Sequence, residues 1–150
     1  MKNKQATKII SILSITLLIL DQSTKLLAKI YLNPGINFTQ YLGLNYTENT
    51  GIAWSIQIPQ QLLIPLNLII FTSIIAYLIK NLNLKNNISK VIISLFIAGA
   101  LGNIYDRITR NYVIDFINIW KWPIFNLADT YLVIGGFIII TYYGKIIRKN

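Results

Sequence analysis

The 150-residue sequence contains no cysteine and no histidine, and it has only five acidic side chains. These absences exclude disulfides, thiol nucleophiles, imidazole bases and most transition-metal sites, so we expect neither a metal ion nor a cofactor. Any chemistry must therefore use carboxylates, hydroxyls, amides or amines. The five acids are Asp21, Glu48, Asp106, Asp115 and Asp129.

Charged residues are also scarce, at 13% of the chain, whereas 54% of the residues are hydrophobic. This composition is too apolar for an ordinary soluble fold. Four apolar stretches approach the length that crosses a bilayer, and they cover about residues 9–27, 62–79, 91–105 and 127–143. The third stretch contains Gly99 and Gly102, which permit close contact between helices. We predict a mainly α, integral membrane protein with four transmembrane helices in a single domain, residues 1–150.

The first apolar stretch has an alternative interpretation as a cleavable signal peptide, because Lys2, Lys4 and Lys8 precede it. However, the polar segment from Asp21 to Lys25 stands where a small-x-small cleavage site would be expected, and the apolar pattern resumes beyond it. We therefore favour a first helix that is retained.

The basic residues divide unequally between the two sides of the membrane. With the N-terminus in the cytoplasm, nine of the 14 Lys and Arg residues and none of the acids lie on that side. The positive-inside rule therefore places both termini in the cytoplasm and all five acids at the outer face. Because this orientation accounts for the net charge of +9, we expect no nucleic-acid partner.

The longest segment between spans, about residues 30–61, lies outside the cell in this topology. Residues 36–41 alternate between apolar and polar side chains, and residues 42–46 repeat the alternation. Pro34 and Gly35 supply a turn before them. We expect a small extracytoplasmic β-sheet that rests on the outer leaflet.

Ionisable residues in or beside a span are costly and usually have a partner or a function. Asp21 and Lys25 are four residues apart on one helix face, and Asp106 has Arg107 beside it and Arg110 one turn later. We interpret Asp21, Lys25 and Asp106 as members of structural ion pairs. The guanidinium of Arg107 suits a substrate carbonyl or a lipid phosphate.

Asp115 and Asp129 have different surroundings. Asp115 lies in an apolar run whose nearest bases are five residues before it and six after it, and desolvation without a cationic neighbour raises a carboxyl pKa. The run indicates a short extended piece at the membrane interface, and an edge strand with an outward Asp would have the same sequence. Asp129 follows Asn126 by three residues, which is the spacing of a helix N-cap and its N3 acid.

Two carboxylates brought together cannot both ionise cheaply, so one keeps its proton while the other accepts one. Such a pair activates water against a peptide carbonyl without a nucleophilic side chain or a metal, and it titrates as a unit.

Two other functions are compatible with the acids of this sequence. One is a small transporter or channel subunit with a polar path through Asp21, Lys25, Asp106 and Arg107. The other is a structural adaptor in which the acids cap helices.

Five motifs, taken in order, resemble the lipoprotein signal peptidase family, also called signal peptidase II. Each motif is weak alone, but the order, the length and the four spans agree over nearly the whole chain. The motifs are Asp21-Gln22-x-x-Lys25, Asn49-Thr50-Gly51-x-Ala53, Gly102-Asn103-x-x-Asp106-Arg107, Val113-x-Asp115-Phe116-Ile117 and Phe125-Asn126-x-Ala128-Asp129.

The resemblance implies an aspartyl endopeptidase of the bacterial inner membrane. Such an enzyme cleaves the signal peptide of a diacylglyceryl-modified prolipoprotein just before the lipidated cysteine. Family members are inhibited by globomycin-type compounds and place a small sheet and an interfacial helix on the outer leaflet. We expect this chain to be a monomer among membrane lipids. By matching motif, Asp115 and Asp129 are the catalytic residues, and the residues that bind substrate or support the site are Asn49, Gly51, Asn103, Arg107 and Asn126.

The sequence departs from the family pattern at two glycine positions. Ala98 replaces one of them within the third span, and Ala is small enough to keep the helix contact. The other falls near Asn111, and Asn tolerates the left-handed backbone conformation better than most residues.

Overall fold

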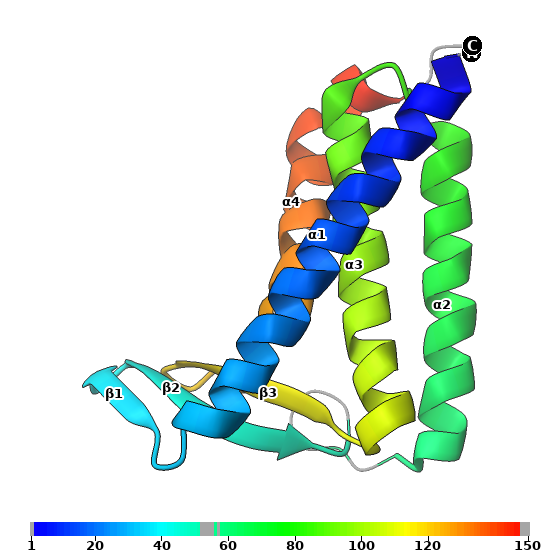
Figure 1. Cartoon of the computed structure of the whole chain (residues 1–150). Helices are drawn as coiled ribbons and strands as arrows, with labels where there is room; N and C mark the ends of the chain where they lie inside the picture. The colour runs from blue at the N-terminus through cyan, green and yellow to red at the C-terminus, as the bar shows by residue number, and fades with distance from the viewer. Residues whose placement is uncertain (1, 52–55, 57, 148–150) are drawn as a thin grey trace.

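The computed structural model describes residues 2–51, 56 and 58–147, in which four helices stand side by side and a small sheet lies at one end (Figure 1). Both chain ends lie at the opposite end of the helices. The elements in chain order are α1 (Lys2–Tyr31), β1 (Ile36–Thr39), β2 (Leu42–Asn49), α2 (Gln60–Asn81), α3 (Asn87–Arg110), β3 (Val113–Ile119) and α4 (Leu127–Ile146).

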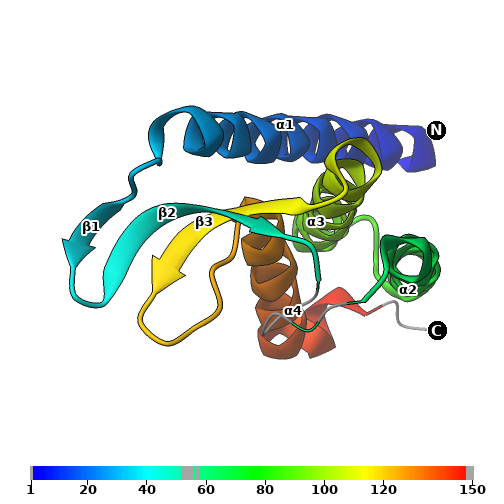
Figure 2. The same ribbon diagram turned by 90° about the horizontal axis from the view of Figure 1, so that it is seen from below.

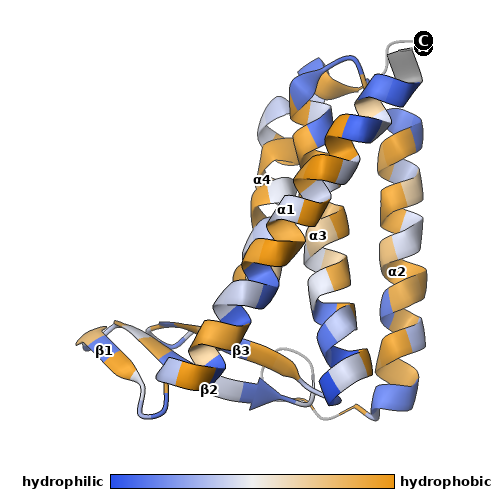
Figure 3. Cartoon of the chain, in the orientation of Figure 1, coloured by the Kyte–Doolittle hydropathy of each residue, from blue (hydrophilic) through white to orange (hydrophobic). Residues whose placement is uncertain are grey.

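All four helices are long and apolar enough to cross a membrane, which confirms the predicted fold class. Figure 3 shows apolar residues along the middle of the helices and polar residues towards both ends. Each predicted span lies inside its helix, and the helices continue into the polar residues that flank it. The 30-residue α1 is the longest, at about 45 Å.

The helix α3 is the centre of the bundle. In its apolar window 67% of the residues are buried inside the protein, whereas the other three helices bury 17% or less and leave most of their apolar side chains for lipid. Seen along the bundle, α3 lies between α1, α2 and α4 (Figure 2). Gly99 and Gly102 permit this close packing, because a Cβ atom at Gly102 would lie 2.5 Å from the Asp21 carboxylate and one at Gly99 2.6 Å from the Ala128 carbonyl.

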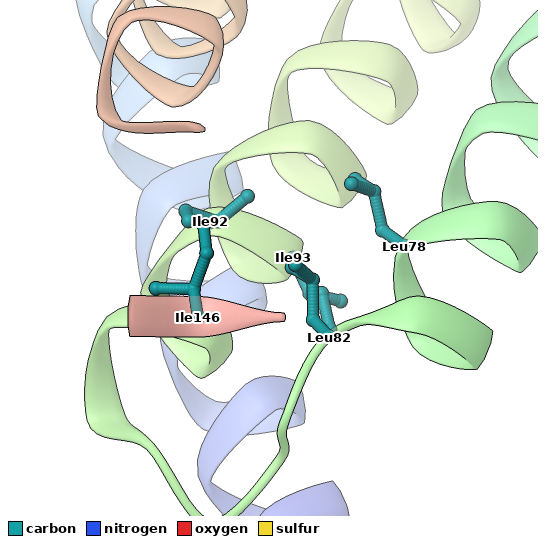
Figure 4. Close-up of a cluster of buried hydrophobic side chains, with 5 residues drawn as sticks. All are labelled: Leu78, Leu82, Ile92, Ile93 and Ile146. Carbon is teal, nitrogen blue, oxygen red and sulfur yellow. The ribbon is translucent and has the colours of Figure 1, made fainter. Parts of the chain in front are cut away.

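An apolar cluster connects α2, α3 and α4 at the end of the bundle that is farthest from the sheet. It consists of five buried side chains from these helices and their ends, Leu78, Leu82, Ile92, Ile93 and Ile146 (Figure 4). The backbone N–H of Asn83 donates to the Ile146 carbonyl at 2.8 Å, and the Asn86 side chain caps α3. These contacts hold the helix ends that are farthest from the sheet.

The sheet is antiparallel with the strand order β1-β2-β3, so the first two strands confirm the predicted alternation and β3 joins them from a distant part of the chain. Ala28 and Leu32 at the end of α1 pack with Ile114 and Phe116 of β3. The interfacial helix was expected within about residues 30–61, and residues 52–55 and 57 of that segment lie outside the described residues.

The helix α3 ends at Asn111, whose φ of 64° is left-handed, and the N–H of this residue donates to the Arg107 carbonyl at 3.1 Å. Asn111 thus has the left-handed conformation that Asn tolerates better than most residues. The reversal here sends the chain directly into β3.

Candidate active site

Asp115 lies near the start of β3, opposite Thr47 of β2, and its side chain is only 3% exposed. The alternative of an outward-facing Asp on an edge strand is therefore wrong. Burial, followed by the nearby charge of Asp129, raises the pKa of Asp115 to about 6, although hydrogen bonds from Asn49 and Asn126 act in the opposite direction.

Asp129 lies in the first turn of α4 and forms a capping box with Asn126. The Asn126 side chain accepts from the Asp129 N–H at 3.0 Å, and the Asp129 Oδ2 accepts from the Asn126 N–H at 3.3 Å. The capping interpretation is thus correct, but it occupies only one carboxylate oxygen. The other oxygen, Oδ1, accepts from the Asn103 side chain at 2.8 Å.

The two carboxylates line the same cavity of about 290 Å³ at the sheet end of the bundle. The walls come from β2, α2, α3, β3, α4 and the loop before α4. The lining residues include Asn49, Asn67, Phe71, Asn103, Arg107, Asp115 and Asp129.

Three asparagine amides hold the carboxylates in place. Asp115 accepts from Asn126 at 2.6 Å and from Asn49 at 2.9 Å, one amide on each of its oxygens. Asn126 also donates to the Asn103 side-chain oxygen at 3.1 Å, so an amide chain links the two acids. Amide donors of this kind stabilise negative charge on a carboxylate pair and fix its geometry.

Lys25 determines which way the Asn103 amide faces. Its Nζ is fully buried and donates to the Asn103 side-chain oxygen at 3.0 Å, so the Asn103 nitrogen must point to Asp129. The same Nζ lies 2.8 Å from Asp21 and 3.0 Å from Asp106. Lys25 therefore joins the ion pairs of α1 and α3 to the amide chain of the cavity.

Asp21 and Asp106 are fully buried and bind structural partners. Asp21 accepts from the Ala128 backbone N–H at 2.9 Å, which attaches α1 to the N-terminus of α4. Asp106 binds Lys25 and Arg110 and accepts from the Ile114 N–H at 3.3 Å. The expected pairs of Asp21 with Lys25 and of Asp106 with Arg110 are present, and Lys25 is shared between the two acids. Arg107, the other base expected beside Asp106, binds the Gly51 carbonyl instead.

Arg107 reaches from α3 to the turn after β2, where its Nη2 donates to the Gly51 carbonyl at 3.1 Å. The N–H of Gly51 donates to the Asn49 side chain at 3.0 Å, so the predicted turn is present. The Arg107 Nε is buried and has no hydrogen-bond partner within the described part of the chain. The Arg107 side chain is therefore held by the turn after β2 where it lines the cavity.

Sequence reasoning missed the contribution of α2. Asn67 and Phe71 line the cavity from a helix that carries none of the recognised motifs. The available signal was Asn67 itself, an amide within an otherwise apolar stretch.

The sequence pattern of the family described as "Signal peptidase (SPase) II" matches residues 13–144. The chain is 33% identical to the lipoprotein signal peptidase of Chlorobaculum tepidum, over 93% of this chain and 96% of that protein. It is 34% identical to that of Staphylococcus haemolyticus, over 93% of each, and 38% identical to that of Clostridium novyi, over 79% of this chain and 85% of that protein.

Solved structures agree with the sequence comparison. A bacterial membrane enzyme determined by the in meso method at 2.3 Å resolution matches with a TM-score of 0.74 and 30% identity, over 91% of this chain and 87% of that one. A second such structure, at 1.9 Å, matches with a TM-score of 0.69 and 29% identity, over 91% and 92%. With this pattern, these relatives and this fold, the chain belongs to the signal peptidase II family of membrane peptidases.

Proposed function

We propose that this chain is an aspartyl endopeptidase that removes the signal peptide of diacylglyceryl-modified prolipoproteins just before the lipidated cysteine. Asp115 and Asp129 are its catalytic residues. The observation that carries the proposal is that these two carboxylates, buried Asp115 from β3 and half-buried Asp129 from α4, line one cavity. The lipoprotein signal peptidases among the relatives support the substrate class.

The chemistry needs one ionised and one protonated carboxyl group. Water held between the acids attacks the scissile carbonyl carbon while the ionised Asp takes a proton from the water. The protonated Asp donates its proton to the carbonyl oxygen, which gives a neutral gem-diol. The first Asp then protonates the departing amine, the gem-diol returns a proton to the second Asp, and the C–N bond breaks.

The amide chain suits this proton exchange. Asn49, Asn103 and Asn126 donate to the carboxylates and carry no charge, so neither Asp is held permanently ionised by a direct ion pair with a base. Arg107 lines the cavity, and its guanidinium is suited to hold a substrate carbonyl beside the scissile bond. Asn49 and Gly51 position Arg107 through the turn after β2.

The substrate approaches within the bilayer. A signal peptide is an apolar helix, and the cavity opens among membrane-spanning helices whose outer faces are apolar. We propose that the termini lie in the cytoplasm, as the distribution of Lys and Arg favours, with the sheet and the cavity at the outer face of the bacterial inner membrane. Globomycin-type inhibitors would compete for this cavity.

The decisive experiment compares Asp115→Asn and Asp129→Asn with wild type. Each purified variant is incubated with a lipidated precursor peptide, with and without globomycin, and the cleaved fragment is measured. We expect each substitution to lower kcat by more than about 10³-fold, because Asn cannot exchange the proton. Glu48→Gln, which alters an exposed acid on β2, is the matched control and should cleave normally.

Normal cleavage by both Asp variants would overturn the proposal. If wild type leaves the peptide intact but carries ions or protons into liposomes, the transporter function is favoured instead. If cells tolerate Asn at both positions and neither wild type nor the variants cleave the peptide, the adaptor function is favoured.

A further inference from the structure

The helix α2 contributes two side chains to the cavity, Asn67 and Phe71. They are one helical turn apart and so lie on the same face of α2. Among the described elements α2 packs chiefly on α3 (Figure 2), and only 11% of its apolar window is buried inside the protein, so α2 borders both the cavity and lipid. The position places an amide and an aromatic ring where a substrate would enter.

The Asn67 amide is unusual for its surroundings. The helix α2 has a mean hydropathy of 2.4, the highest of the four spans, and Asn67 is half-buried within it. No hydrogen bond joins its side chain to another residue that the structure describes. Ser73, further along α2, donates to the Ile69 carbonyl of its own helix at 2.7 Å. A polar group without a partner is costly in a membrane, so Asn67 is expected to have a ligand.

The main chain of the proposed substrate needs hydrogen-bond partners of the kind that the Asn67 amide offers. To present a peptide carbonyl to the two acids, the signal peptide must leave its helical conformation near the cut. Its main-chain N–H and C=O groups then lack helix partners in a water-poor region, which is energetically unfavourable for each unsatisfied group. A side-chain amide supplies one donor and one acceptor, which matches an extended main chain.

The depth of Asn67 indicates which part of the substrate it meets. The helix α2 begins at the sheet end with Gln60, and Asn67 lies about 10 Å further into the span. Phe71 lies about one turn deeper. The apolar helix of the signal peptide occupies this depth, whereas the lipidated cysteine lies beyond the cut.

We propose that Asn67 is a substrate-binding residue that hydrogen-bonds the main chain of the signal peptide on the side preceding the scissile bond, while Phe71 packs against an apolar side chain there. This inference rests on the proposed function of the cavity. Asn67 binds and orients the substrate and exchanges no proton in the reaction.

The test measures kcat/KM for wild type, Asn67→Leu and Asn67→Gln with a lipidated precursor peptide in lipid bicelles. We expect Asn67→Leu to lower kcat/KM roughly tenfold, because it leaves substrate polar groups unpaired, and Asn67→Gln to recover part of the loss. Ser73→Ala, on the same helix but bonded to its own backbone, is the control and should match wild type. Asn67→Leu should melt at the wild-type temperature or above it, because α2 becomes more apolar.

A second series of substrates separates binding from a structural effect. Precursor peptides each carry one backbone ester in place of one amide among the residues before the cut, which removes a single N–H donor. For one ester position, we expect Asn67→Leu to lower kcat/KM by less than about twofold relative to wild type. For the other ester positions the loss of kcat/KM should stay as large as with the parent peptide, as in a double-mutant cycle. A penalty that is the same for all ester peptides, or no penalty with the parent peptide, would overturn the inference. Absence of cleavage by wild type would instead count against the proposed function.

Discussion

The Asp115 carboxyl group is buried between β2, β3 and the loop before α4. Burial is the main reason that its pKa rises from 3.8 to about 6, and the charge of Asp129 adds to the rise. Two amide donors lower the cost of ionisation but do not remove it. The folded protein therefore binds the Asp115 proton more tightly than the unfolded chain does.

This difference makes stability depend on pH. The contribution of Asp115 is most favourable below pH 4, is lost as the pH rises through 6, and is constant above that, with a total change of up to about 3 kcal/mol. We expect Asp115→Asn to remove most of this slope between pH 4 and pH 6. Reversible denaturation in detergent micelles at several pH values measures it. Glu48→Gln should keep the slope, and an unchanged slope in Asp115→Asn would show that burial of this carboxyl does not destabilise the fold.

At the scale of elements, α3 positions the site. It carries Asn103 and Arg107 into the cavity, and its small residues allow α1 and α4 to approach closely enough for Asp21 to reach the Ala128 N–H. The Asp21 oxygen beside Gly102 cannot move away freely, because Lys25 holds it at 2.8 Å. A side chain at Gly102 must therefore disturb an ion pair as well as the packing.

We expect Gly102→Ala to destabilise the protein by about 1–3 kcal/mol, because the new methyl group would overlap the Asp21 carboxylate. Gly136→Ala on α4 is the matched control: nothing lies within 4 Å of its Cβ position, so the gain in helix propensity should stabilise the protein by up to about 1 kcal/mol. Tryptophan fluorescence during thermal unfolding compares the two. Equal melting temperatures for Gly102→Ala and wild type would contradict the close approach of α1 to α3.

At the scale of the whole molecule, the proposed orientation separates the two ends of the bundle. Because the chain has no cysteine, single cysteines can be introduced without background labelling. One at Lys85, between α2 and α3, marks the end near the termini, and one at Gln40, between β1 and β2, marks the sheet end. In intact spheroplasts we expect a membrane-impermeant maleimide to label Gln40→Cys and to spare Lys85→Cys until the cells are lysed. The reverse pattern would invert the topology.

Local sequence patterns determine most of the secondary structure of this protein. Apolar runs locate the four helices, alternation locates β1 and β2, and the capping spacing of Asn126 and Asp129 locates the start of α4. The left-handed conformation of Asn111 is compatible with its residue type. These features depend on interactions within a few residues, or between the chain and lipid, which is why the sequence alone predicts them and, through ordered motifs, the family.

Contacts between distant segments were decided only by the tertiary structure. Pairing of β3 with β2 buries Asp115 beside the cavity that Asp129 lines from α4. Lys25 reaches Asn103 across 78 residues of chain, and α2 brings Asn67 to the cavity. A periodic pattern shows which face of a helix is apolar, but not which helix packs against it or at what depth. The shared cavity of Asp115 and Asp129 therefore depends on how α3, α4 and the sheet pack together.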